Sequence, residues 1–191
     1  MSTVRFITHP EVAIDPSRPV ADWPLSPVGS RRVVLMLEAP WVSTVRAVFC
    51  SSERKATDMA CMMADHLSLT PVIIDGLREN DRSATGYLPK PEFEVMADAF
   101  FARPDESVRG WERAVDAQRR IVEAVGRAIT MAPDGDMAIV SHGGVGALLL
   151  CHLKHVNVSR AEDQPGQGGG NVFSFEAATR RLLSGWRRIE A

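Results

Sequence analysis

The chain has 191 residues, of which 45% are hydrophobic, so it is long enough for one substantial core and short for two typical domains. We therefore expect a single domain over residues 1–191. The 22 Lys and Arg residues nearly balance the 24 Asp and Glu residues, which excludes the strongly basic surface of a nucleic-acid-binding protein and the acidic tail of a highly charged one.

The expected location follows from features that the sequence lacks. Its first twelve residues hold no basic stretch followed by a long apolar run, and the most apolar later segment, Ala138 to Cys151, is interrupted by polar residues and glycines. We therefore expect no signal peptide, no membrane span and a cytoplasmic protein. Reduced, buried thiols are expected at the three cysteines, which lie far apart in apolar surroundings and form no CxxC pair: Cys50, Cys61 and Cys151.

Strands and helices alternate along the chain. The segment from Val4 to Thr8 is apolar and stops before a proline, which predicts a strand that ends at His9. Ser26 followed by Pro27 is typical of a capped helix start and predicts a helix to about residue 39. The later patterns predict, in order, a strand at 45–50, a helix at 53–66 with N-cap side chains from Ser51 and Ser52, a strand at 71–74, a long loop at 77–91, helices at 93–102 and 111–130, a strand at 138–141, a helix at 145–153, and strands at 172–176 and 182–188.

This alternation predicts an α/β fold, a three-layer α/β/α sandwich with a mostly parallel central sheet. In open α/β sheets the ligand site lies outside the carboxyl ends of the strands. By that rule four features converge at one edge: His9, the 51–55 segment, Glu79 and His142. Two histidines, a carboxylate and nearby cations indicate phosphoryl transfer, because an imidazole nitrogen can attack phosphorus while a carboxylic acid protonates the leaving oxygen.

At these positions the sequence resembles the histidine phosphatase superfamily, with its phosphoglycerate mutase-like fold, from Val4 to about Leu150. The motif at 139–144 is the most specific of them, since it is similar to the family's V-x-H-G-G. The other segments that carry the resemblance are Thr8-His9-Pro10 at the family's Arg-His-Gly, residues 24–29 at its P-L-T-x-x-G, residues 51–56 at its SS…RA, and residues 77–79 at its L-x-E.

The resemblance implies a role for each of three residues. His9 is the residue that becomes phosphorylated, Glu79 is the proton donor, and His142 holds the phosphoryl group by hydrogen bonding. The candidate phosphate-binding residues are Thr8, Arg54, Lys55, Ser141 and Gly143, and Arg82 and Glu11 are further candidates. The implied chemistry acts on a small phosphorylated substrate and needs no metal and no other cofactor.

The chain departs from the family's pattern at three positions. Thr8 stands at an arginine, Pro10 at a glycine and Lys55 at a second arginine. Lysine keeps the charge without the bidentate fork, and threonine loses the charge. Losing one preorganised donor to a transition-state oxyanion costs about 2.7 to 4 kcal/mol, or roughly 10² to 10³ in rate. Our hypothesis is that Arg54 or Arg82 turns into the cleft and partly replaces the missing guanidinium.

Several alternatives stay open at this point. The first hypothesis is hydrolysis or transfer of a phosphoryl group through a phosphohistidine, and the second is a catalytically weak or inactive relative that binds a phosphorylated ligand or a protein partner. Phosphatase and mutase share the first chemical half, so the sequence does not separate them. We expect the 82–101 segment to form a lid that selects the substrate, and a homodimer is the default oligomeric state.

Overall fold

The structure is a computed structural model that describes residues 2–166 and 168–191. Each of the six strands and five helices predicted from the sequence is present. In chain order they are β1 (Thr3–Thr8), α1 (Pro27–Leu37), β2 (Val45–Cys50), α2 (Arg54–Leu67), β3 (Val72–Ile73), α3 (Lys90–Ala102), α4 (Ala114–Met131), β4 (Asp136–Ser141), α5 (Gly143–Leu153), β5 (Asn171–Glu176) and β6 (Leu182–Arg188). Within these residues no helix has the length and apolar character needed to cross a bilayer.

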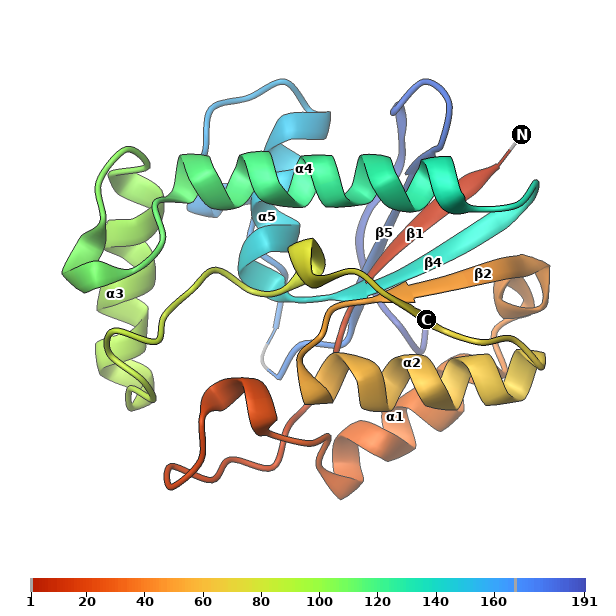
Figure 1. Ribbon diagram of the computed structural model, residues 1–191, viewed down its shortest axis with the longest axis horizontal. Helices are drawn as coiled ribbons and strands as arrows, with labels where there is room; N and C mark the ends of the chain where they lie inside the picture. Colours follow the sequence, from red (N-terminus) through yellow and green to blue (C-terminus); the bar gives the residue numbers. More distant parts are fainter. Residues whose placement is uncertain (1, 167) are drawn as a thin grey trace.

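The six strands form one sheet in the order β3-β2-β4-β1-β5-β6. The pairs β2–β3, β2–β4 and β1–β4 are parallel, and β5 and β6 add two antiparallel pairs at one edge. The predicted mostly parallel sheet is therefore confirmed. The parallel strands run toward the end of the molecule where α3 and the loop after β1 lie (Figure 1).

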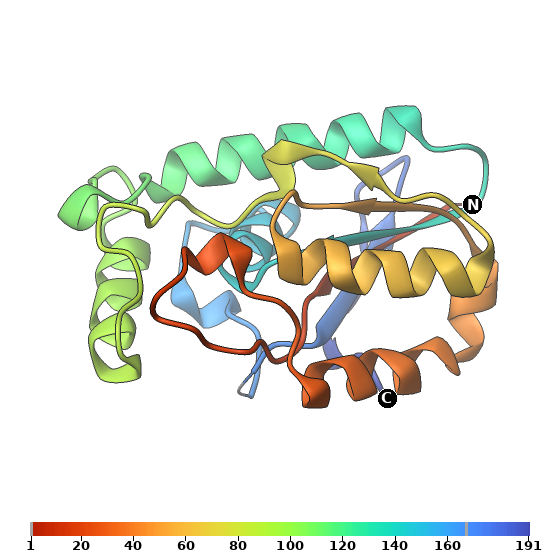
Figure 2. The same cartoon turned by 60° about the horizontal axis from the view of Figure 1, so that its bottom comes forward.

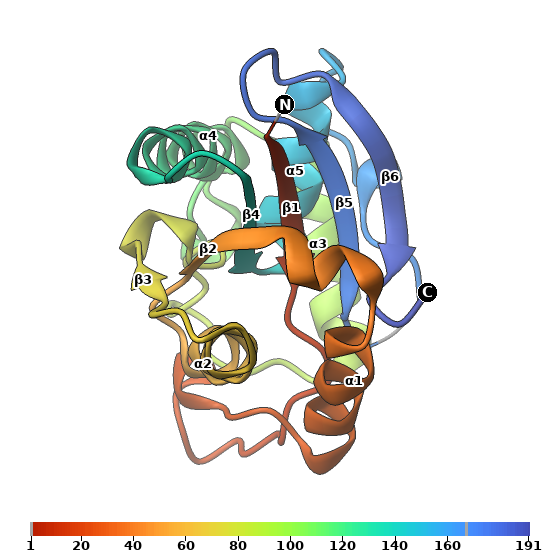
Figure 3. The ribbon, with the colours of Figure 1, turned by 90° about the vertical axis from the view of Figure 1, so that its right-hand side faces the viewer.

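Helices cover both faces of the sheet, as the end-on view in Figure 3 shows. Successive residues of a strand point to opposite faces, so Phe6 and Ile139 pack on the side of α3, α4 and α5, whereas Ile7 and Val140 pack on the side of α1 and α2. All four of these side chains are fully buried. The apolar residues of β4 follow one another without a polar interruption because helices cover both faces of the strand. The predicted three-layer sandwich is confirmed.

Helix starts agree with the sequence at α1 and differ at α2. Ser26 caps α1 by accepting a hydrogen bond from Gly29 N at 2.9 Å, with Pro27 at the first helical position. The N-cap of α2 is Glu53 rather than Ser51 or Ser52, and its side chain makes no cap bond. The prediction was wrong because Ser51 lies in the turn before the helix. Its hydroxyl accepts a hydrogen bond from the Glu53 N–H there, ahead of the first helical residue.

Three other expectations need correction. The predicted 111–130 helix begins at Ala114, because Trp111 turns into the core with only 2% of its surface exposed and closes a short 3-10 turn. The predicted 77–91 loop ends earlier and the predicted 93–102 helix begins earlier, because α3 starts at Lys90. Of the cysteines, Cys50 and Cys151 are buried as expected, whereas Cys61 lies on the outer side of α2 and is exposed.

Candidate active site

The order of the strands in the sheet brings His9, His142 and Ser51 together. In the order β2-β4-β1 the central strand is β4, so His142 lies between Ser51 after β2 and His9 after β1. Backbone hydrogen bonds extend the sheet past the strand ends, from His9 N to Ser141 O at 3.1 Å and from Ser51 N to Val140 O at 3.0 Å. The sheet therefore fixes where the backbone of these residues lies.

His9 is oriented by its own loop. Its Nδ1 lies 2.9 Å from the carbonyl oxygen of Pro10, which can only accept, so Nδ1 carries the proton and Nε2 has a free lone pair. Burial, followed by the charge of Lys55, lowers the pKa of His9 to about 4. At neutral pH the ring is therefore uncharged, with an unprotonated Nε2.

His142 packs edge-on against His9, with ring centroids 5.1 Å apart. It is fully buried, and burial lowers its pKa to about 4. Its Nε2 lies 2.7 Å from the Ser51 hydroxyl, and its Nδ1 is buried with no hydrogen-bond partner among the described residues. If Ser51 donates to Nε2, the neutral ring carries its proton on Nδ1, which then has no acceptor among the described residues.

Lys55 and Glu53 form a nearly buried ion pair at the start of α2. The Lys55 ammonium lies 2.5 Å from Glu53 Oε2 and donates to the carbonyl of Val20 at 2.7 Å. Figure 2 shows the loop after β1, with its short helical turn at Val20–Asp22, lying against this end of α2. Burial opposes the charged form of Glu53, yet His142 and Lys55 lower its pKa to about 2. Glu53 is therefore ionised at neutral pH and neutralises the cation beside it.

Glu79 is held at the N-terminus of α5. Its two carboxylate oxygens accept from the backbone N–H groups of Gly144 at 3.1 Å and Val145 at 3.0 Å, where the helix dipole favours an anion. The neighbouring Asn80 is buried, and its amide Nδ2 has no partner in the described part of the chain. Leaving such a donor unsatisfied costs about 1–3 kcal/mol, which a bound acceptor would recover.

A cavity of about 620 Å³ lies beside this group of residues, and its lining includes neither of the two histidines. Glu53, Glu79 and Asn80 line it from one side, and Arg82 lines it from the loop that follows. The positive charge of Arg82 is the smallest of the influences that lower the pKa of His9, after burial and the charge of Lys55. Of the two arginines in our hypothesis, Arg82 turns toward the cleft, whereas Arg54 is exposed and does not line the cavity.

Other candidate phosphate ligands are engaged elsewhere. Thr8 is fully buried, and its hydroxyl donates to Gln164 Oε1 at 2.6 Å. The Ser141 hydroxyl donates to Leu77 O at 2.7 Å. Glu11 accepts from the Ser26 hydroxyl at 2.7 Å and ties the loop to α1. The structure thus brings together His9, His142, Lys55, Glu79 and Arg82, and uses Thr8, Ser141 and Glu11 as structural links.

Sequence reasoning missed three contributors. Glu53 had no assigned role, although an acid two residues from Lys55 at a helix start was a visible signal. Asn80 follows Glu79 directly and was passed over. Gln164 approaches the site from a distant loop, and an added Cβ at Gly143 would lie 2.2 Å from its amide nitrogen. Gly143 therefore leaves room for the Gln164 amide, a packing relation that no local pattern signals.

Comparison with known proteins identifies the family. The model of the histidine phosphatase superfamily (branch 1) matches residues 9–186. The chain belongs to this superfamily. No curated protein sequence matches it. A family of this kind supports a general function in phosphoryl hydrolysis or transfer.

Solved structures show the same fold at low sequence identity. Bacillus stearothermophilus YhfR is 23% identical with a TM-score of 0.77, and the alignment covers 96% of this chain and 95% of that one. A mycobacterial glucosyl-3-phosphoglycerate phosphatase with inorganic phosphate is 20% identical, with a TM-score of 0.76 and all of both chains covered. A phosphoserine phosphatase mutant from Entamoeba histolytica with phosphoserine is 14% identical, with a TM-score of 0.73 over 97% and 96% of the chains.

Proposed function

We propose that the protein hydrolyses or transfers the phosphoryl group of a small phosphate monoester through a phosphohistidine at His9. The orientation and protonation of His9 carry this proposal. Its Nδ1 proton is held by Pro10 O, and its pKa of about 4 keeps Nε2 unprotonated at neutral pH. Nε2 is thus a ready nucleophile, which forms a bond to phosphorus as the ester P–O bond breaks.

The phosphoryl oxygens find donors in groups that have no protein partner. His142 Nδ1 and Asn80 Nδ2 are buried and unpaired within the described residues, and Arg82 supplies a positive charge at the cavity. In phosphoryl transfer the protein acts mainly by positioning and by stabilising charge on the transferring oxygens. These three side chains fit that task, and no step of the proposal uses a metal.

The leaving oxygen takes its proton from a carboxyl group, for which Glu79 is our candidate. Glu53 is a poor proton donor because its pKa is about 2. Glu79 lines the same cavity, is fixed by backbone N–H groups at α5, and acts in its protonated form, which the negative charge of a bound phosphate favours over the carboxylate. After the alcohol leaves, Glu79 receives the proton of the water or acceptor alcohol that attacks the phosphohistidine, which restores His9.

One observation favours a second candidate, a weak or inactive relative that binds a phosphorylated ligand or protein partner. The cation at the family's arginine position, Lys55, is already paired with Glu53 at 2.5 Å. The threonine at the other arginine position donates its hydroxyl to Gln164. A site with these two cations lost or neutralised holds phosphate with fewer charged donors than its relatives use.

Turnover and trapping of the intermediate separate the two candidates. We expect hydrolysis of phosphate monoesters in the presence of a chelator, and acid-labile label on the protein after rapid quenching with a labelled ester. His9→Gln should abolish both signals, whereas His152→Gln, at an exposed histidine on α5, should leave both unchanged. Phosphate binding without turnover or label in the wild type would reject the enzyme and favour the binding protein. Added acceptor alcohols then separate mutase from phosphatase by the products formed.

A further inference from the structure

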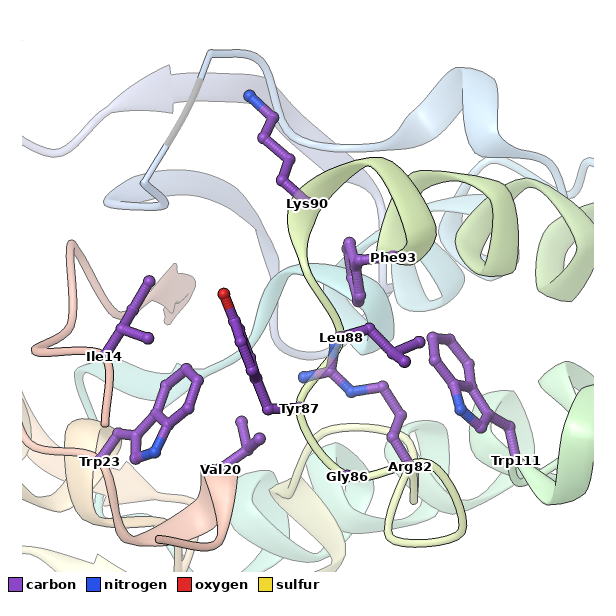
Figure 4. Close-up of a pocket in the computed structure, with 10 residues that line it drawn as sticks. All are labelled: Ile14, Val20, Trp23, Arg82, Gly86, Tyr87, Leu88, Lys90, Phe93 and Trp111. Carbon is purple, nitrogen blue, oxygen red and sulfur yellow. The ribbon is translucent and has the colours of Figure 1, made fainter. Parts of the chain in front are cut away.

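A second pocket adjoins the cavity that Glu79 and Arg82 line, and its lining has a different chemical character. We call it the aromatic pocket, and its volume is about 230 Å³. Figure 4 shows Trp23 and Ile14 on the loop after β1 beside Tyr87, with Phe93 and Trp111 on the other side of Tyr87. Its complete lining is Ile14, Val20, Trp23, Arg82, Gly86, Tyr87, Leu88, Lys90, Phe93 and Trp111.

The two indoles in the walls of the aromatic pocket are buried, and their N–H donors are already used. Trp23 is 5% exposed, and its Nε1 donates to Asp15 O at 2.8 Å. Trp111 is 2% exposed, and its Nε1 donates to Thr85 Oγ1 at 2.9 Å. Because these polar atoms are satisfied within the protein, the two indoles offer a ligand apolar surface rather than hydrogen-bond donors. Such walls favour a flat, apolar occupant.

Arg82 joins the aromatic pocket to the candidate active site. It lines both hollows, together with Val20 and Gly86. Its guanidinium carbon lies 5.0 Å from the ring centroid of Phe93 and 5.7 Å from that of Trp111. A guanidinium stacked in this way still presents N–H groups at its edge for phosphate oxygens. Because Arg82, Val20 and Gly86 line both hollows, a ligand that extends from the first cavity along Arg82 enters the aromatic pocket.

Size and charge narrow the occupant further. An apolar cavity of about 150 Å³ is enough for benzene, so a volume of about 230 Å³ holds a six-membered ring with a short substituent. The lining contains two cations, Arg82 and Lys90, and no carboxylate. The larger cavity of about 620 Å³, in contrast, is lined by acids such as Glu53 and Glu79 as well as by cations. The aromatic pocket therefore suits a neutral ring attached to an anionic phosphate.

We propose that the aromatic pocket binds an aromatic ring in the alcohol portion of the substrate, so that the substrate class is an aryl-bearing phosphate monoester. This inference rests on the proposed function, since it assumes a phosphoryl group at His9. It assigns specificity to Tyr87 and Trp23, which pack against each other with ring centroids 5.5 Å apart and line the pocket, and gives Arg82 the place between ring and phosphate.

Equilibrium binding tests the aromatic pocket without turnover. In a His9→Ala background we would measure the dissociation constants of benzyl phosphate and glycerol phosphate by calorimetry. We expect benzyl phosphate to bind at least about tenfold more tightly, a difference of about 1.4 kcal/mol. Tyr87→Ala and Ile14→Ala, at side chains 39% and 60% exposed, should each reduce that preference at little risk to folding. Tyr87→Phe keeps the ring and should retain it.

Val95→Ala is the matched control, because this side chain is 68% exposed on α3 and does not line the pocket. Equal affinities for the two esters, or an equal loss for both in Tyr87→Ala, would overturn the inference. Steady-state kinetics of the wild type separate it from the proposed function. Preferential binding of benzyl phosphate with no hydrolysis of any ester keeps the aromatic pocket and rejects the phosphatase. Hydrolysis with no preference for the aryl ester supports the phosphatase and rejects the aromatic pocket as a substrate-binding site.

Discussion

Replacing Glu53 with glutamine should make the site bind phosphate more tightly. The Glu53 carboxylate contacts Lys55 Nζ at 2.5 Å, accepts from Glu79 N at 2.9 Å and lies 3.6 Å from His142 Nε2. These contacts are of the kind that a phosphate would make in the same place. Since the pKa of Glu53 is about 2, the carboxylate is an anion at any ordinary pH and repels an incoming one.

The distances give the size of the effect. A phosphate oxygen that accepts from Lys55 at about 2.8 Å lies about 5 Å from the Glu53 oxygen on the far side of the ammonium. Two unit charges at that separation interact by about 3 kcal/mol at an effective dielectric of about 20, and by about 0.8 kcal/mol in bulk water. The site is partly open to solvent, so we expect Glu53→Gln to bind phosphate about tenfold to a hundredfold more tightly.

Calorimetric titration with inorganic phosphate at pH 7 measures this gain directly. Glu123→Gln, at an exposed acid on α4, controls for the change in net charge. The ligand-free Glu53→Gln protein should also melt at a lower temperature, because Lys55 loses its buried counter-charge, and phosphate should raise that temperature more than it does in the wild type. An unchanged or weaker phosphate affinity in Glu53→Gln would refute the view that Glu53 competes with the ligand.

Three further predictions concern pH and packing. The pKa of His9, about 4, places the acid limb of the kcat/KM profile near pH 4 to 5, and a limb near pH 6.5 would contradict the neutral nucleophile. Because the pKa of His142 falls from 6.5 in the unfolded chain to about 4 in the folded protein, the unfolded chain binds more protons between these values. Stability should therefore rise from pH 4 to pH 6.5, and urea unfolding of wild type should show about 3 kcal/mol more of this rise than His142→Gln. Gly29→Ala places a Cβ 2.1 Å from the Glu11 carbonyl oxygen, so it should lower the free energy of unfolding by about 1–3 kcal/mol, and an unchanged urea midpoint would contradict this.

The fold could be predicted from the sequence because local signals and packing agree. The Ser26-Pro27 start of α1 and the apolar run of β4 specify their elements without reference to the rest of the chain. Trp111 was assigned to α4 by its apolar period, but it packs into the core ahead of the helix. Periodicity reports which residues are buried, and it does not separate a buried helical residue from a buried turn residue beside the helix.

The site was predictable only where a residue follows a strand. His9 and His142 come together because β1 and β4 are adjacent and parallel, which the strand rule anticipates. The pairing of Lys55 with Glu53 and the position of Arg82 depend on how long side chains turn within a cleft. Neighbouring elements decide those rotamers, so the candidate cations can be named from the sequence, but which of them face the cleft cannot.

Thr8 shows the same limit and leads to the last prediction. From sequence alone, Thr8→Arg would restore the family's arginine. In the structure the Thr8 hydroxyl donates to Gln164 and accepts from Asn171 N at 3.0 Å in a fully buried place. An arginine there breaks both bonds and overfills the space, at a cost of about 1–3 kcal/mol from each effect. We expect Thr8→Arg to lower the melting temperature without raising the rate of ester hydrolysis or the affinity for phosphate. Thr8→Ser, which keeps the hydroxyl, should stay close to the wild type. A stable Thr8→Arg protein with tighter phosphate binding would show that the buried threonine network is dispensable and that the missing arginine is the dominant loss.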